Sequence, residues 1–592
     1  MGPRPNAGAA RWTSFATGRR TRGSVTGLGS LLFGNRLTSR LRRVWIGAFV
    51  ALAVCVSPAQ AGTATDASGA AGVFAKVDIE AAIKQVKADY AATYGGHEPN
   101  TARLHTLLQQ LYANLLNNQA VSGLVAGMNW GDIQLSDPSG PSGQACNPHG
   151  DTPSGCDWSY LDDVFKVAGI ASVPVHIQIT PGFDSPGWLV TKIPSCDGLF
   201  DPKTAASVAA DCGTVTFTYF PEINHTGTDD DGKYVLPLPW NSVYQQAWWS
   251  FLKLFAQRYN SSLGVAVSPL AAVSIAGPVS VSPEIIFPTS ANKSTLPSGM
   301  DVDEAWTTLI QHSVPPNVTE PPDYAQTDEV FIGQWKAAID QYESIFTGLT
   351  LILTPDASND LPEFTNDRWQ KSPFTSPVYP VDCSKSKTPR SCEAKAEIIS
   401  YFIAATGSNR KSTLVGGLTA SSDTAFGDIG MPGVRLVTSL SPPFGPPAIF
   451  GGAEVDHPIS GNEQMRQETG CPTDKAPDKK QCKGLTQEEA EADVLYDFFY
   501  GTPDAAHFPQ ARQFVGSGGV GNEQGTVEFL WVPYLDILYA TANKCLDEKK
   551  ILRGDTSVQD QLDSASYYLL VMADQPEPRL PPACAISSGP RR

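Results

Sequence analysis

Apolar runs alternate with amphipathic helical patterns along most of this 592-residue chain, and this alternation constrains the fold more than any other feature. Several runs are apolar throughout, which is typical of strands buried on both faces of a parallel sheet. Between most of them, apolar residues recur at the 3.6-residue spacing of a helix. The runs span residues 121–128, 173–180, 270–277, 348–354, 412–418, 433–438, 447–452 and 528–534. Eight strands with intervening helices predict an α/β fold, a (β/α)8 or TIM barrel.

The connections that follow the predicted strands are long. About sixty residues separate the run 173–180 from the next clear helix, and about fifty follow the run 270–277. Barrel sites are built from the loops after strands, so this asymmetry favours a functional site at the carboxyl ends of the strands.

The cysteines predict that disulfide bonds cross-link these loops. Ten cysteines follow residue 61 and fall into neighbouring pairs, most of them within the long loops. The predicted disulfides are Cys146–Cys156, Cys196–Cys212, Cys383–Cys392, Cys471–Cys482 and Cys545–Cys584. No CxxC-type spacing of a zinc site occurs, so we predict no metal and no cofactor.

The first 61 residues have the pattern of an export signal. They contain nine arginines and no acid, then the 13-residue apolar run VWIGAFVALAVCV, then Ala59-Gln60-Ala61. That run is shorter than the ~20 residues that span a bilayer, so the pattern predicts a signal peptide, a secreted or periplasmic protein and no membrane span after cleavage. Losing nine arginines takes the formal charge from −17 to −26, which argues against nucleic-acid partners.

The remaining chain is predicted to be one decorated domain. Residues 62–118 form an N-terminal helical segment with helices at 77–94 and 101–116. Residues 119–545 form the barrel, and residues 546–592 form a helix and a tail tethered by the last disulfide.

Two glutamates lie where a barrel places its catalytic groups. Glu284 follows the run 270–277, and Glu454 follows the run 447–452, whose glycines would let the backbone approach a ligand. Cleavage of a glycosidic bond needs two carboxyl groups, of which one protonates the leaving oxygen and the other attacks the sugar or activates water. The pair therefore predicts a glycosidase.

Other side chains are candidates for binding a carbohydrate substrate. Asp356 lies two residues past a predicted strand, and several tryptophans follow strand ends. The predicted substrate-binding residues are Trp130, Trp158, Trp188, Trp531 and Asp356. His176 lies inside a strand, where it is either core or a site wall. No HExxH, GxSxG or P-loop pattern occurs, which removes support for a zinc protease, a serine hydrolase or an NTPase.

Three short segments resemble the clan A glycoside hydrolases, especially the β-galactosidase-like families. They are NW at 129–130, CDWSYLD at 156–162 and ITPGFDSPGWL at 179–189, and the similarity extends over roughly residues 121–540. The resemblance implies an acid/base glutamate after the fourth strand and a nucleophile after the seventh. It thereby assigns Glu284 as the acid/base, Glu454 as the nucleophile and Trp531 as the sugar-stacking aromatic of the eighth strand.

Two departures from the family pattern leave alternatives open. Pro283 precedes Glu284 where the family has an asparagine, and Glu284 follows only the third run counted. Either a strand precedes Val121 and residues 433–438 are not a barrel strand, or the register is wrong. The sequence predicts a secreted, retaining glycoside hydrolase, with a non-catalytic carbohydrate-binding barrel as the alternative.

Overall fold

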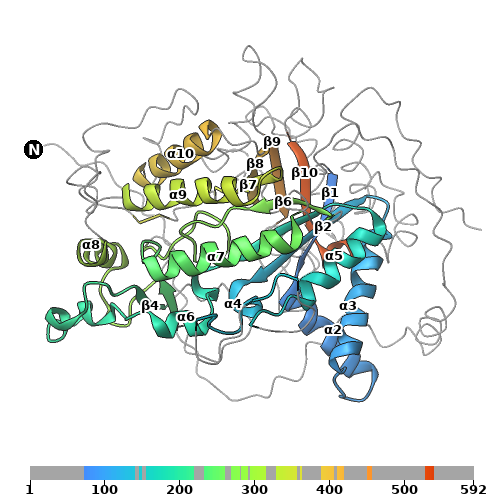
Figure 1. Cartoon of the computed structure of the whole chain (residues 1–592), viewed down its shortest axis with the longest axis horizontal. Coiled ribbons are helices and arrows are strands. Elements are labelled where there is room, and N and C mark those ends of the chain that lie inside the picture. The colour runs from blue at the N-terminus through green and yellow to red at the C-terminus, as the bar shows by residue number, and fades with distance from the viewer. Residues whose placement is uncertain are drawn as a thin grey trace, which may run out of the picture. The chain divides into compact units, whose positions relative to one another are not determined.

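Eight parallel strands form one sheet in the computed structural model, and β1 pairs with both β10 and β2, which closes the sheet into a barrel (Figure 1). The order of neighbours is β1-β10-β9-β8-β7-β6-β3-β2. The strands are β1 (Gly72–Asp78), β2 (Val121–Asn129), β3 (Val175–Thr180), β6 (Leu270–Ser274), β7 (Thr350–Leu353), β8 (Arg410–Leu418), β9 (Phe450–Val455) and β10 (Val527–Pro533).

The structure describes residues 72–139, 146–149, 155–218, 233–260, 268–280, 282–290, 294–314, 329–355, 361–362, 389–405, 410–418, 450–455 and 527–538. They all belong to one compact unit, Ser68–Arg592. The predicted signal peptide, the run 433–438 and the tail 546–592 lie outside the described residues. Of the described helices, none is long and apolar enough to cross a membrane.

Helices connect the strands from β1 to β8. The helices are α2 (Ile79–Thr93), α3 (Thr101–Leu116), α4 (Trp130–Ile133), α5 (Ser159–Ala171), α6 (Gly187–Lys192), α7 (Ser242–Tyr259), α8 (Val302–Ser313), α9 (Glu329–Ile345) and α10 (Pro389–Ala404), with 3-10 turns η1 (Gly182–Asp184), η2 (Asp197–Phe200) and η3 (Ala205–Ser207). The connections from β8 to β9 and from β9 to β10 lie outside the described residues, so the helical repeat is described only up to β8.

The barrel begins earlier than the sequence predicted. Strand β1 lies inside residues 62–118, which we expected to be helical, and the predicted helix 77–94 gives its first two residues to this strand. Asp78 ends β1 and caps α2 by accepting a hydrogen bond from the Ala81 amide, a strong local signal for a helix start. With β1 counted, β6 is the fourth strand along the chain, β9 the seventh and β10 the eighth.

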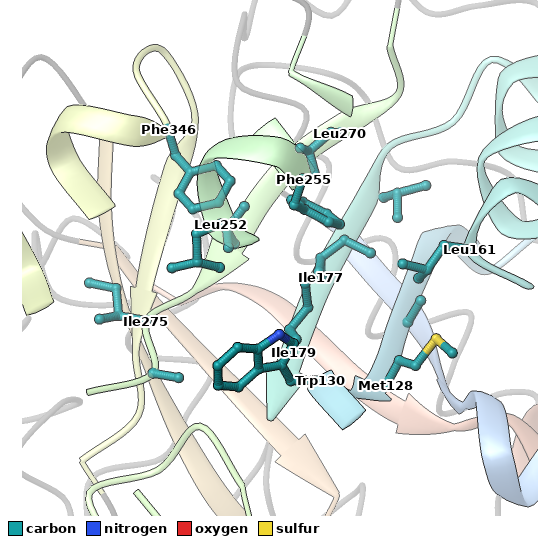
Figure 2. Close-up of a cluster of buried hydrophobic side chains, with 14 of the residues drawn as sticks. Met128, Trp130, Leu161, Ile177, Ile179, Leu252, Phe255, Leu270, Ile275 and Phe346 are labelled. Carbon is teal, nitrogen blue, oxygen red and sulfur yellow. The ribbon is translucent and has the colours of Figure 1, made fainter. Parts of the chain in front are cut away.

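The main core lies between the outward faces of the strands and the helices. Ile177 and Ile179 alternate along β3 with side chains of the opposite face, and they pack with α5 and α7. Figure 2 shows them in one cluster with Leu161 of α5 and Leu252 of α7. Asn241 starts α7 by accepting hydrogen bonds from two backbone amides.

A smaller cluster fills the inside of the barrel. Its six buried members come from five strands and are Phe74, Val125, Ala272, Ile352, Phe529 and Trp531. Gly452 of β9 makes room for this cluster, because a Cβ atom there would lie only 2.0 Å from a ring carbon of Phe529. The glycine therefore serves internal packing in the structure, where the sequence had indicated approach to a ligand.

The long connections after β3 and β6 build a second core. The first contains the antiparallel pair β4 (Thr214–Thr218) and β5 (Lys233–Pro237), and a bridge between Thr218 and Thr295 joins it to the second. Trp306 of α8 packs on Phe217 and Phe287, which links both connections in one buried cluster. The described parts of these two connections thus share one hydrophobic core.

Two predicted disulfides are confirmed. Cys146–Cys156 closes the connection before α5, and Cys196–Cys212 lies in the second core. Cys392 is also disulfide-bonded. The remaining cysteines of the predicted pairs, Cys383, Cys471, Cys482, Cys545 and Cys584, lie outside the described residues.

Candidate active site

Because all eight strands run in parallel, their carboxyl ends meet at one rim of the barrel. Glu454 lies in the seventh strand, one residue before its end, and Glu284 lies in the connection after the fourth. Both sequence-predicted glutamates therefore belong to segments at this rim.

Glu454 is a buried carboxylate with an opposite charge beside it. Its side chain is only 3 % exposed, and the Lys76 ammonium of β1 forms an ion pair with its Oε1 atom. The other oxygen, Oε2, is buried and accepts no hydrogen bond in the part of the chain that the structure describes. Among the described residues, the Lys76 ammonium thus binds one oxygen of the Glu454 carboxylate, and no hydrogen-bond donor binds the second.

Beside Glu454, the aromatic side chains of Trp531 and Phe74 hold the neutral ring of His176 in place. Trp531 is the register partner of Glu454 across β9 and β10, and its Nε1 donates a hydrogen bond to Nδ1 of His176 at 3.1 Å. The His176 ring stacks on Phe74 with 3.9 Å between centroids. Burial lowers the pKa of His176 to about 3, so the imidazole is neutral and carries its proton on Nε2.

Glu284 is held at the end of the fifth strand. Its backbone forms a parallel bridge with Thr354, the residue after β7, and the Ile285 amide donates to the Thr354 carbonyl at 3.1 Å. The amide of Ile286 donates back to the Glu284 carbonyl at 2.8 Å, which makes a tight turn at this point. The Glu284 side chain is half-buried.

Two aspartates at the ends of the second and third strands form a site feature that the sequence analysis missed. Asp184 of η1 has a buried Oδ2 atom without a hydrogen bond among the described residues. Burial, and then the charges of Asp132, Glu80 and Asp78, raise the pKa of Asp184 to about 8. Burial also raises the pKa of Asp132, and Glu80 adds to this.

The signal for these aspartates was present in the sequence. Asp184 lies four residues past β3 and Asp132 lies three past β2, which is the same criterion that selected Glu284. Among the described residues, no group of three or more His, Cys, Asp or Glu side chains could hold a metal ion.

The predicted substrate-binding tryptophans divide into two groups. Trp130 and Trp158 are buried in the main core, where both pack on Phe251 of α7. Their burial favours packing over contact with a sugar. Trp188 of α6 is only partly buried, and its Nε1 donates to the Gln134 carbonyl at 3.2 Å. Trp531 is fully buried inside the barrel, and Asp356 lies outside the described residues.

The described residues define an α/β protein whose closed parallel sheet carries a buried, lysine-paired carboxylate at its rim. No family model matches the chain, and no curated protein matches it.

Among solved structures, the chain is similar to the catalytic domain of β-amylase from Paenibacillus polymyxa, with 12 % identity and a TM-score of 0.29, over 79 % of this chain and 95 % of that one. It is also similar to an inactive double mutant of MUTB, with 9 % identity and a TM-score of 0.26, over 84 % of each chain. At these values neither structure assigns a residue or an activity to this chain.

Proposed function

We propose that this protein is an exported, retaining O-glycoside hydrolase with a complete (β/α)8 barrel. The observation that carries the proposal is Glu454, a carboxylate buried at the rim end of the seventh strand, whose Oε2 atom has no hydrogen-bond partner among the described residues. An ionised group so deeply buried is costly unless it is paired, and such groups concentrate at functional sites.

The corrected strand count supports the same proposal. Once β1 is included, Glu284 follows the fourth strand and Glu454 lies in the seventh. These are the positions that the resemblance to clan A glycoside hydrolases assigns to the acid/base and the nucleophile. In this count, the order of the strands agrees with the assignment of both glutamates.

The two carboxyl groups would divide the reaction between them. Oε2 of Glu454 attacks the anomeric carbon while the Glu284 carboxyl protonates the leaving oxygen, and a covalent glycosyl-enzyme forms. Glu284 then takes a proton from water, which attacks the anomeric carbon and releases Glu454 with net retention of configuration. This mechanism needs the two carboxyl groups about 5–5.5 Å apart.

Of the predicted substrate-binding tryptophans, the partly buried Trp188 is the one we assign to contact with the sugar. Trp188 lies on α6, in the connection after the third strand, and its side chain is partly exposed. Trp531 lies deeper, beside Glu454, where it supports the nucleophile from inside the barrel.

The proposed export rests on the signal pattern in residues 1–61 and on the disulfides, which persist in oxidising compartments. Cleavage after Ala61 would leave β1 intact.

The test uses a panel of aryl glycosides of both anomeric configurations. Glu454→Gln should lower kcat by at least about 10⁴-fold, because the carboxylate is the nucleophile and no other group replaces it. Glu284→Ala should lose activity on alkyl leaving groups and keep most of the first step on dinitrophenyl leaving groups, which need no protonation.

Glu98→Gln is the matched control, because Glu98 is 71 % exposed and only 3.9 Å from the Lys87 ammonium. It should leave turnover unchanged. A folded Glu454→Gln variant with wild-type activity would remove the nucleophile assignment.

A second candidate function is a non-catalytic carbohydrate-binding barrel. Two observations favour it. Pro283 precedes Glu284 where the family has an asparagine, and the Lys76–Glu454 ion pair could serve only to stabilise the inside of the barrel. Calorimetric titration with oligosaccharides separates the two functions, because a binding barrel would give heat of binding with no release of reducing sugar.

A further inference from the structure

We infer that Lys76 is the positioning residue of the nucleophile: it holds Oε1 of Glu454 and so leaves Oε2, the attacking oxygen, outside the ion pair. This inference rests on the proposed function of Glu454. Lys76 itself does not touch the reacting atoms in this scheme, because its ammonium binds the other carboxylate oxygen.

The barrel topology places Lys76 within reach of Glu454. Strand β10 lies between β1 and β9, and its register pairs Phe74 with Trp531 and Trp531 with Glu454. Lys76 is two residues past Phe74, so it shares the inward face of β1 one step nearer to the rim. Its side chain crosses β10 inside the barrel to reach the carboxylate, and it remains 26 % exposed.

The charge balance explains why a lysine is needed there. Burial to 3 % exposure disfavours the charged form of a carboxylate, whereas an adjacent opposite charge favours it. A nucleophilic carboxylate must be ionised, so the Lys76 ammonium offsets the cost of burying Glu454.

The choice of lysine over arginine leaves one oxygen available. A lysine ammonium is a compact point charge, whereas a guanidinium forms a fork that engages both oxygens of a carboxylate. In the structure Lys76 pairs with Oε1, and Oε2 has no hydrogen-bond partner among the described residues. An arginine in this position would keep the charge but occupy the attacking oxygen.

Other charged groups do not take over this role in the described part of the chain. On one side of Glu454, β10 presents Trp531, which does not ionise, and through it the neutral His176. On the other side, β8 carries Arg410 and Lys411 at its first two positions, at the end opposite to the rim. Beyond β10, Asp78 is the last residue of β1. Its carboxylate accepts a hydrogen bond from the Ala81 amide.

The experiment compares Lys76→Met and Lys76→Arg with the wild-type chain over the pH range of activity. Lys76→Met should move the acid limb of kcat/KM upward by about one to three pH units, because the ionised carboxylate has lost its opposite charge and forms only at higher pH. Lys76→Arg should keep the limb within a few tenths of a unit but lower kcat by about 10²-fold, because the attacking oxygen is engaged.

The outcomes separate this inference from the proposed function. If the wild type is active and Lys76→Met leaves the acid limb where it was, the inference is overturned and the function stands. An inactive wild type on the whole glycoside panel overturns the proposed function, and the inference with it. If Lys76→Met does not fold, Lys76→Gln keeps a hydrogen-bond donor without charge, and the same limb shift is expected of it.

Discussion

Burial acts on two ionisable side chains of the barrel with opposite results, Asp184 at the rim and His176 inside the barrel. It keeps Asp184 protonated, because the charged form of a carboxyl is the disfavoured one, and it keeps His176 unprotonated for the same reason. Both groups are therefore neutral near pH 7, whereas Lys76 and Glu454 form a charged pair. The ion pair is the feature that singles out Glu454 among these buried groups.

Asp184 makes the stability of the protein fall as pH rises. Its pKa is about 8 in the folded chain and returns to the ordinary 3.8 on unfolding, so between these values the folded state holds an extra proton. Asp184→Asn imitates the protonated form at every pH. We expect it to raise the apparent Tm by about 1–2 °C above pH 8, with the difference vanishing below pH 4, in thermal scans followed by circular dichroism.

Asp137→Asn is the control with the opposite sign. The Asp137 carboxylate accepts hydrogen bonds from Ser139 and Lys192, which lower its pKa, so ionisation of this group supports the fold. This exposed site should lose a little stability above pH 4 when it is neutralised. A pH-independent effect of Asp184→Asn would show that the Asp184 carboxyl does not titrate as the structure indicates.

At the scale of the strand, the glycine in front of Glu454 sets the position of β9. Gly452 faces the Phe529 ring so closely that an added Cβ overlaps it, and Glu454 follows two residues later on the same face. Gly452→Ala should destabilise the protein by about 1–3 kcal/mol through overpacking, measured as a lower urea midpoint. It should also reduce turnover, because the displaced strand carries Glu454.

Gly169→Ala gives the matched comparison in a helix. Gly169 lies inside α5, and a Cβ atom there meets nothing within 4 Å. Because alanine loses less backbone entropy in a helix, this change should stabilise the protein by about 0.5–1 kcal/mol. Equal destabilisation by both substitutions would mean that the Phe529 contact is not what makes Gly452 necessary.

The sequence predicted most of the elements because their patterns are local. The runs at 121–128 and 173–180 became β2 and β3, and the predicted helix 101–116 became α3 with the same bounds. Strand β1 was not predicted, because Lys76 interrupts its apolar run GVFAKVD. The opposite charge that makes a lysine on the inward face of this strand acceptable, that of Glu454, lies 378 residues away in the chain. No local pattern contains that information.

The candidate site was predictable only in part, for the same reason. Both glutamates were found because an acid after an apolar run is visible in one window of sequence. The ion pair with Lys76 and the hydrogen bond from Trp531 to His176 depend on strand order, which periodicity does not contain. Trp130 shows the converse error, since a tryptophan after a strand end predicted sugar contact but packs on Trp248 and Phe251 in the core.

For the molecule as a whole, β1 connects the fold and the proposed chemistry. It pairs with both β10 and β2, so it joins the last described strand of the chain to the early part of the barrel. It also contributes Phe74 to the inner cluster and Lys76 to the carboxylate. Loss of this one strand would open the sheet, expose two edges and leave Glu454 buried without its opposite charge.

Truncation at two nearby points tests this role. A chain that begins at Ser68 keeps β1 and should unfold in one cooperative transition with activity like that of the processed protein. A chain that begins at Ile79 lacks residues 68–78 in addition, which include all of β1. It should lose the near-ultraviolet circular dichroism of packed aromatic rings and aggregate, because both freed strand edges can pair with other chains. If the shorter chain melted at the same temperature with the same spectrum, β1 would be an attachment to the barrel, and closure of the sheet would have to come from another segment.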